Sequence, residues 1–243
     1  PAGHGALISN LNSIEQDIIF IKNIDNVVKE DLIEETVEYK KALGGYLVEI
    51  QNKIFEFLNL LSDSENKKIN YEELIEFCES KLFIAIDNEL SNEEKHSILY
   101  SIFNRPIRVC GVVKNEGEPG GGPFWIEDSY NNISMQIVES AQVDLNSKNQ
   151  SEIWSKSTHF NPVDIVCGVY DYNGKKFNLN EFIDYEAGII TEKSFNGKDI
   201  KALELPGLWN GSMANWNTVF VEVPLSTFNP VKTVFDLLRD KHQ

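Results

Sequence analysis

The sequence is poor in cysteine and has no pair of cysteines at metal-binding spacing. Its three cysteines, Cys78, Cys110 and Cys167, lie far apart, and no CxxC motif occurs. This pattern argues against a disulfide framework and against a structural zinc site. We therefore expect three buried, free thiols in a protein of the reducing cytoplasm.

Positive charge is also scarce. The chain has 22 Lys and Arg against 38 Asp and Glu, which gives a formal net charge of −16. Such a field repels nucleic acid and anionic membranes, and no cluster of basic residues reverses it locally. We therefore expect no nucleic-acid partner. Any phosphorylated substrate would need a divalent metal or a few well-placed lysines to offset the background charge.

Long hydrophobic runs are absent, and none approaches the roughly 20 residues that a membrane-spanning helix needs. We therefore expect no membrane partner. The first residues contain neither an initiator methionine nor a signal-peptide pattern, so we expect the C-terminal part of a longer protein. The length of 243 residues is enough for one large domain, or for one domain with an insertion. The sequence predicts no oligomeric state.

The order of apolar patterns predicts an α/β fold with a mixed sheet. Residues 1–30 and 105–243 alternate strands and helices, which is typical of an α/β domain. Residues 31–104 follow helical spacing almost throughout, and we interpret them as an all-helical insertion.

Individual elements can be predicted from the same patterns. The expected strands cover 17–22, 107–113, 134–139, 164–170 and 217–223. The expected helices cover 6–12, 31–61 with a break at Gly44-Gly45, 70–86, 91–103 and 230–239. Ser91 and Glu94 form a capping box, and Pro230 suits a first helical position. The apolar run at 18–21 indicates a fully buried strand, as in a parallel sheet.

Three short motifs could carry chemistry. The glycines of Gly3-His4-Gly5 would let a flat ligand approach the backbone beside an imidazole. Asp25 follows a predicted strand, where a carboxylate can hold Mg²⁺ against phosphate oxygens. Lys232 lies in the first turn of the predicted last helix, where free N–H groups and an ammonium suit a phosphate. The simpler alternatives are a turn with a surface histidine, an Asx-turn and a surface lysine.

Two further segments are compatible with sugar binding. Consecutive glycines at 120–122 can cradle an anion or leave room for a sugar, and the neighbouring Glu116 and Glu118 favour hydroxyls or a shared metal. A flexible loop that needs positive φ is the alternative. The segment 208–216 offers two indole rings and several Asn side chains, although core packing of at least one Trp is the stronger expectation.

Read in order, PAGHGALI, IIFIKNIDNV and FNPVKTVFDLL resemble the motifs of the UDP-sugar pyrophosphorylases. Four other segments, GVVKNEGEPGGGPFW, QIVES, HFNPVD and LWNGSMANWNTVFVEVP, are similar to a bacterial family described as domain of unknown function 4301. That second resemblance covers most of the chain. The first implies the C-terminal portion of a GT-A-like nucleotidyltransferase fold, which is a Rossmann-like α/β fold.

The pyrophosphorylase resemblance also implies roles for matching residues. We expect nucleotide binding by Gly3, His4, Gly5 and Asn26, sugar binding by Glu139, Asn161, Gly121 and Gly122, and catalysis by Asp25 and Lys232, with Asp25 as the Mg²⁺ ligand. Gly121 and Gly122 are included because consecutive glycines leave room for a sugar.

The sequence departs from the pyrophosphorylase pattern at several positions. Ala6 stands where that family usually has Asp, Ser140 where it has Tyr, and Asn229 where an apolar residue is common. The glycine-rich nucleotide loop that the family has upstream of its GHG motif is absent from this chain. We therefore expect that this chain alone does not catalyse nucleotidyl transfer.

The leading functional hypothesis is sugar-1-phosphate uridylyl transfer in the full-length protein, with a nucleoside triphosphate and a sugar phosphate as partners. The alternatives are a non-catalytic nucleotide-sugar sensor and a glycosyltransferase of the same fold. The leading hypothesis requires Asp25 and Lys232 to face a common cleft beside the GHG turn.

Overall fold

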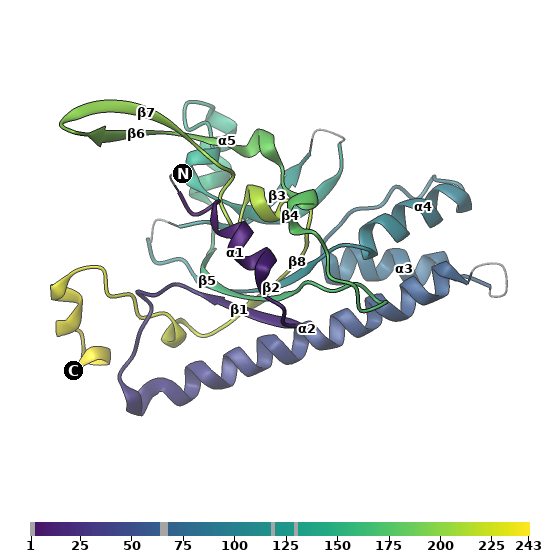
Figure 1. Ribbon diagram of the computed structural model, residues 1–243, viewed down its shortest axis with the longest axis horizontal. Helices are drawn as coiled ribbons and strands as arrows, with labels where there is room; N and C mark the ends of the chain where they lie inside the picture. The colour runs from purple at the N-terminus through teal and green to yellow at the C-terminus, as the bar shows by residue number, and fades with distance from the viewer. Residues whose placement is uncertain (1–2, 64–67, 118–119, 129–130) are drawn as a thin grey trace.

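A four-stranded mixed sheet forms the centre of the protein in a computed structural model that describes residues 3–63, 68–117, 120–128 and 131–243 (Figure 1). The strand order is β1-β5-β2-β8. β1 (Ile18–Lys22) and β2 (Ile107–Lys114) both pair antiparallel with β5 (His159–Gly168), and β2 pairs parallel with β8 (Asn217–Glu222). The predicted α/β class with a mixed sheet is therefore confirmed.

Two hydrophobic cores lie on opposite faces of this sheet. On one face pack α2 (Ile33–Ser62), α3 (Tyr71–Phe77) and α4 (Asn92–Phe103), and their core includes Leu47, Leu58, Leu99 and Val109. The other face is covered by α1 (Leu7–Ser13), by the β3–β4 hairpin (Gly122–Glu127 and Ile133–Val138) and by the segment 206–216. The core on that side includes Ile8, Ile165, Met213 and Trp216.

The remaining elements lie outside these two layers. α5 (Lys148–Ser155) precedes β5, and β6 (Ile189–Phe195) pairs with β7 (Lys198–Glu204) in a hairpin. Figure 1 shows this hairpin as a ribbon that extends away from the sheet. The sequence patterns did not predict either β3 or the β6–β7 hairpin, whose alternation of apolar and polar residues is weak.

The helical zone is confirmed in its main elements and corrected in two of them. The Ser91–Glu94 capping box is present at the start of α4. α2 continues through Gly44-Gly45 without a break, and Gly44 instead makes room for Phe20, whose ring would lie 3.0 Å from an added Cβ. The helix expected over 70–86 ends at Leu82 after a π-helical turn, because Phe83 adopts a left-handed conformation. The interpretation of 31–104 as a separate insertion stays a prediction.

The first strand is not fully buried, and this prediction was wrong. In the part of the chain that the structure describes, β1 is an edge strand, and its side chains alternate between buried and exposed positions. Ile19 is buried in the core, whereas the side chain of Phe20 is 50% exposed. The run of isoleucines therefore reflects an antiparallel edge, with Phe20 packed at the rim of α2, and not a parallel strand covered on both faces.

The helix predicted over 230–239 does not form either. Pro230 makes an isolated antiparallel bridge with Asn26, and two short 3₁₀ turns (Val234–Leu238 and Asp240–His242) follow. Thr233 caps the first turn together with Asp236, so the first helical residue lies four positions after Pro230 and no α-helix forms.

Arg108, the second residue of β2, is fully buried beneath the segment that leads into β8. Its guanidinium donates hydrogen bonds to Thr218 Oγ1 at 2.9 Å, to Gln136 Oε1 at 3.0 Å and to the backbone carbonyl of Trp209 at 2.5 Å. Burial lowers the pKa of this guanidinium from its ordinary value. All of these acceptors are neutral, so the bonds stabilise a buried cation and at the same time fix the position of the Trp209 backbone.

Replacing Arg108 with Met should therefore destabilise the protein strongly. The substitution keeps much of the side-chain volume but removes the guanidinium donor from the Trp209 carbonyl, Thr218 Oγ1 and Gln136 Oε1, and only the last keeps another donor, the Thr218 hydroxyl. We expect a loss of about 2–4 kcal/mol in the free energy of unfolding. Urea denaturation measures this loss. The exposed Arg239→Met provides the matched control and should change stability by less than about 0.5 kcal/mol. Equal effects of the two substitutions would contradict the structural role of Arg108.

Candidate functional site

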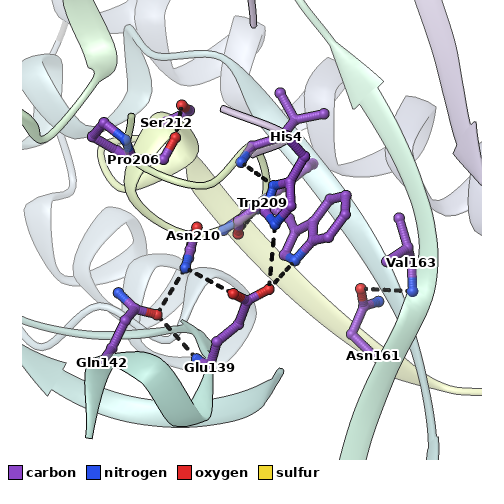
Figure 2. A network of polar contacts seen from close by, with 11 residues as sticks. His4, Glu139, Gln142, Asn161, Val163, Pro206, Trp209, Asn210 and Ser212 are labelled. Atoms are coloured by element: carbon purple, nitrogen blue, oxygen red, sulfur yellow. Dashed lines mark hydrogen bonds and ion pairs between the residues drawn. The ribbon is translucent and has the colours of Figure 1, made fainter. Parts of the chain in front are cut away.

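The carboxylate of Glu139 lies at the centre of a polar network at the end of β4 (Figure 2). The indole N–H of Trp209 donates a hydrogen bond to Oε1. The Asn210 amide lies 3.4 Å from Oε2 and donates a 2.9 Å bond to Gln142 Oε1, which also accepts the Glu139 backbone N–H. His4 Nε2 lies 3.9 Å from Glu139 Oε1. The network brings together two residues that the sequence had singled out separately, His4 and Glu139.

The imidazole of His4 is fixed on two sides. It stacks on the Trp209 indole with ring centroids 3.9 Å apart and an interplanar angle of 16°. Its Nδ1 accepts a 2.8 Å hydrogen bond from the Leu208 backbone N–H. The ring orientation is therefore set by the loop between β7 and β8 and does not depend on a ligand.

The glycines of the GHG turn accommodate this same loop. An added Cβ at Gly5 would lie 2.2 Å from the backbone carbonyl oxygen of Pro206, and one at Gly207 would lie 2.0 Å from Asn210 Oδ1. Gly3 has a φ of 78° and faces the carboxylate of Glu204. The sequence predicted a close backbone approach at these glycines, and the approaching partner in the structure is the protein's own chain. Nucleotide binding by Gly3, His4 and Gly5 stays a prediction.

Gly121, Asn161 and Glu139 lie close together. The Asn161 backbone N–H donates a 2.8 Å bond to the Gly121 carbonyl, and an added Cβ at Gly121 would lie 3.1 Å from Glu139 Cγ. The Asn161 side chain is buried, where its amide donates to the Gly111 carbonyl and accepts from the Val163 N–H. Both polar atoms of this amide are therefore engaged within the sheet.

The glycine-rich loop does not require positive φ at 120–122. The positive-φ glycine in this region is Gly117, whereas Gly121 and Gly122 are held by close contacts with the Glu139 side chain and the His159 carbonyl. Glu118 lies outside the described residues. Sugar binding by Gly121 and Gly122 stays a prediction. The alternative, a flexible hairpin or loop that needs positive φ, is wrong about φ at both positions, although Gly122 does begin the β3–β4 hairpin.

Asp25 and Lys232 lie on segments that pair with each other. The Val231 backbone N–H donates a 2.8 Å bond to the Asp25 carbonyl. Asn26, only 6% exposed, donates to the Thr227 carbonyl at 3.1 Å and accepts from the Asn229 N–H at 2.7 Å. The amide of Asn26 therefore joins the two segments, which is a structural role that the sequence did not reveal.

The predicted phosphate site at Lys232 required free backbone N–H groups at the start of a helix, and this part of the prediction was wrong. No helix begins there, and the N–H groups of Lys232 and Thr233 both donate to Asp236 Oδ2, at 2.9 and 2.7 Å. These bonds, with that of Thr233 the strongest, hold the pKa of the Asp236 carboxyl below its ordinary value. The two amides are therefore taken by a carboxylate, and the exposed ammonium of Lys232 is what remains for an anion.

Both groups of candidate residues lie toward one edge of the sheet. Because β1 and β2 are both antiparallel to β5, and β8 is parallel to β2, the carboxyl ends of β1, β2 and β8 share that edge, where β5 begins. The Val163 carbonyl accepts the Asn23 N–H at 3.3 Å and so links the segment of Asn161 to that of Asp25. Open α/β sheets bind ligands at this edge. That Asp25 and Lys232 face a common cleft beside the GHG turn stays a prediction.

Two hollows open at the same edge. One, of about 520 Å³, lies between α2 and the ends of β2 and β8, and its lining includes Tyr39, Lys114 and Glu222. The other, of about 280 Å³, is lined by the segment Phe228–Pro230 and by residues 239–242. The larger volume falls within the range of small-molecule sites.

The described residues contain no group of three or more His, Cys, Asp or Glu side chains that could hold a metal ion. Asp25 therefore offers a single carboxylate. Mg²⁺ often binds through one or two carboxylates and completes its shell with substrate phosphates and water, so this donor set fits only a substrate-bridged ion. Within the same described ranges, no helix is long and apolar enough to cross a membrane.

The burial of the cysteine and tryptophan side chains tests two further sequence predictions. All three cysteines are free and buried, as expected, and burial raises the pKa of Cys78 to about 12 and that of Cys110 to about 11. Trp216 is 1% exposed and belongs to the core, whereas Trp209 reaches the polar network. The sequence predicted that the segment 208–216 is compatible with sugar binding, but no pattern indicated that Trp209 contacts Glu139.

The geometry defines an α/β protein with a carboxylate-centred polar site and a second group of candidate residues at one edge of its sheet. Among solved structures, a UDP-glucose pyrophosphorylase mutant from Leishmania major in complex with UDP-glucose is 18% identical, with a TM-score of 0.36. The match covers 65% of this chain and 34% of that one. A structure described as UDP-glucose phosphorylase from Trypanosoma brucei is also 18% identical, with a TM-score of 0.38 and coverages of 65% and 33%.

This chain spans about a third of the length of those proteins, and at these TM-scores the likeness carries no argument about fold or activity. A search of curated proteins found no match. The chain belongs to the family described as Domain of unknown function (DUF4301), whose model matches residues 1–243.

Replacing Gly5 with Ala should separate the GHG turn from the loop at Pro206. The new Cβ would collide with a backbone oxygen, and we expect a loss of about 1–3 kcal/mol in the free energy of unfolding, together with a changed Trp209 fluorescence. Gly45→Ala is the matched control, because nothing lies within 4 Å of its added Cβ. This helical position should gain up to about 1 kcal/mol. A Gly5→Ala protein with unchanged stability and fluorescence would contradict this contact.

Proposed function

We propose that this chain is the C-terminal part of a sugar-1-phosphate nucleotidyltransferase, most specifically a uridylyltransferase. In the reaction, a phosphate oxygen of the sugar 1-phosphate attacks the α-phosphorus of a nucleoside triphosphate. The bond between the α-phosphorus and its bridging oxygen to the β-phosphate breaks, and pyrophosphate leaves. Catalysis of this kind depends on positioning and on neutralisation of charge.

The observation that carries the proposal is the pairing of the Asp25 and Lys232 segments. Two motifs from opposite ends of the chain, which the pyrophosphorylase resemblance links to metal and phosphate, are joined by the Val231–Asp25 hydrogen bond and by the Asn26–Pro230 bridge. In a chain with a net charge of −16, a phosphorylated substrate would need a lysine and a metal-binding carboxylate close together, and the pairing of these segments supports that role for Lys232 and Asp25.

Each candidate residue then has a defined task. Asp25 would hold Mg²⁺, which when bound neutralises phosphate charge, and the ammonium of Lys232 would bind a phosphate oxygen. Glu139 would accept hydrogen bonds from sugar hydroxyls, since its carboxylate is already oriented by neighbouring donors. Gly121 and Asn161 would form the wall beside it.

A nucleotide-sugar sensor is the second candidate function. Asp236 occupies the backbone N–H groups beside Lys232, and the described residues contain no group of three or more His, Cys, Asp or Glu side chains that could hold Mg²⁺. Both observations favour binding with little or no turnover. The two functions differ in whether pyrophosphate is released.

Asp25→Asn in the full-length protein tests the proposal. With Mg²⁺, UTP and a panel of sugar 1-phosphates, wild-type protein should release pyrophosphate, and the variant should do so at least about 100-fold more slowly. Asp17→Asn, an exposed carboxylate at the other end of β1, is the matched control and should leave turnover unchanged.

A thermal melt of both variants checks that the fold is intact. Unchanged turnover in Asp25→Asn would remove this residue from the mechanism. A wild-type protein that binds nucleotide-sugar without releasing pyrophosphate would establish the sensor instead.

A further inference from the structure

The two ring nitrogens of His4 have different partners, and this difference fixes the position of the proton. Nδ1 is 2.8 Å from the Leu208 backbone nitrogen, which can only donate. Nδ1 must therefore be the acceptor and carry no proton, so the ring is neutral with its proton on Nε2. That N–H lies on the side of the Glu139 carboxylate, with Nε2 3.9 Å from Oε1.

The donors around Glu139 come from two segments that are far apart in the sequence. Trp209 and Asn210 approach from the loop before β8, and His4 approaches from the GHG turn (Figure 2). The stacked indole and imidazole hold each other in plane, and buried Arg108 holds the Trp209 carbonyl from within the core. Among the residues that the structure describes, the carboxylate thus faces hydrogen-bond donors and forms no ion pair with a Lys or Arg side chain.

A carboxylate oriented in this way is an acceptor for hydroxyl groups. Its two oxygens offer about four lone-pair directions, and the neighbouring donors use only some of them. The side chain is 22% exposed, so a ligand can reach the others. The His4 Nε2–H faces this carboxylate from 3.9 Å, which is longer than a hydrogen bond, and it does not add the positive charge that would draw a phosphate to the group.

We propose that His4 is a positioning residue, locked as the neutral Nε2–H tautomer, which orients Glu139 to accept hydroxyl hydrogen bonds from the sugar of a nucleotide-sugar. This inference rests on the proposed function for its ligand. It assigns His4 to sugar recognition through Glu139, whereas the pyrophosphorylase resemblance implies contact with the base.

Two substitutions at His4 separate its contacts. In His4→Asn, the amide oxygen takes the place of Nδ1 and can accept the Leu208 N–H, but residue 4 no longer places a donor toward Glu139. In His4→Gln, the longer amide can donate toward Glu139 but does not hold Leu208 at the same time. The first variant keeps the docking of the GHG turn, and the second keeps the carboxylate contact.

Calorimetric titration of the full-length protein with UDP-glucose and with UDP tests the role of His4. His4→Asn should weaken binding of UDP-glucose about tenfold, which corresponds to about 1.4 kcal/mol, and should change binding of UDP less than about twofold. His4→Gln should retain more of the UDP-glucose affinity. Equal weakening of both ligands by His4→Asn would mean that His4 contacts the nucleotide, and would overturn the inference while leaving the proposed function intact.

A double-mutant cycle with Glu139→Gln tests whether His4 acts through the carboxylate. The effects of His4→Asn and Glu139→Gln on UDP-glucose binding should be clearly less than additive. Fully additive effects would overturn the positioning role. If the wild-type protein binds neither ligand, the proposed function and the assignment to sugar both fail.

The tautomer can be measured without any ligand. In protein labelled with ¹⁵N-histidine, which has four histidines, the resonances missing from His4→Asn belong to His4. At neutral pH these should report a protonated Nε2 and an unprotonated Nδ1. A proton on Nδ1 would overturn the inference whatever the protein binds.

Discussion

Two long-range hydrogen bonds hold the beginning of the chain against its end, and the candidate site depends on both. The Leu208 N–H donates to His4, 204 residues away, and the Val231 N–H donates to the Asp25 carbonyl. Because each contact closes a very long loop, neither is stable until the sheet between them has formed. The central sheet thus orders the candidate residues, which lie almost entirely in the segments that leave it.

The interior of the protein supports the first of these contacts directly. Arg108 is a buried cation whose bonds end on neutral acceptors, among them the carbonyl of Trp209. Trp209 in turn stacks on His4 and donates to Glu139. A buried residue near the start of β2 therefore determines the geometry of a polar site at the surface, through one loop that has little room to move against Gly5.

The sequence predicted the class of fold and most of the central strands, because β2, β5 and β8 are long runs of apolar residues that pair in the core. It failed where the local signal was ambiguous. The isoleucines of β1 suit a buried strand and an edge strand equally well, and Pro230 suits both a helix start and the bridge that it makes with Asn26. The decision in both cases came from tertiary pairing, which no local pattern contains.

The sequence allowed the residues of the candidate site to be selected, but it did not predict how they are arranged in space. His4 and Glu139 could be selected from their motifs, but their shared contact with Trp209 depends on how the loop before β8 folds back on the GHG turn. Nucleotide binding by Asn26 was expected from the resemblance of its motif to that of the pyrophosphorylases, and it stays a prediction. The structure shows that the Asn26 amide joins two segments of the chain, which no local pattern indicated.

A crystal structure of the full-length protein with Mn²⁺ and a nucleotide-sugar would test most directly whether the two groups of residues form one site. We expect the diphosphate between the carboxylate of Asp25 and the ammonium of Lys232, with a sugar hydroxyl bound to Glu139. Side chains of Asp25 and Lys232 that point to opposite sides of the sheet edge, or a sugar bound away from Glu139, would contradict a common nucleotide-sugar site.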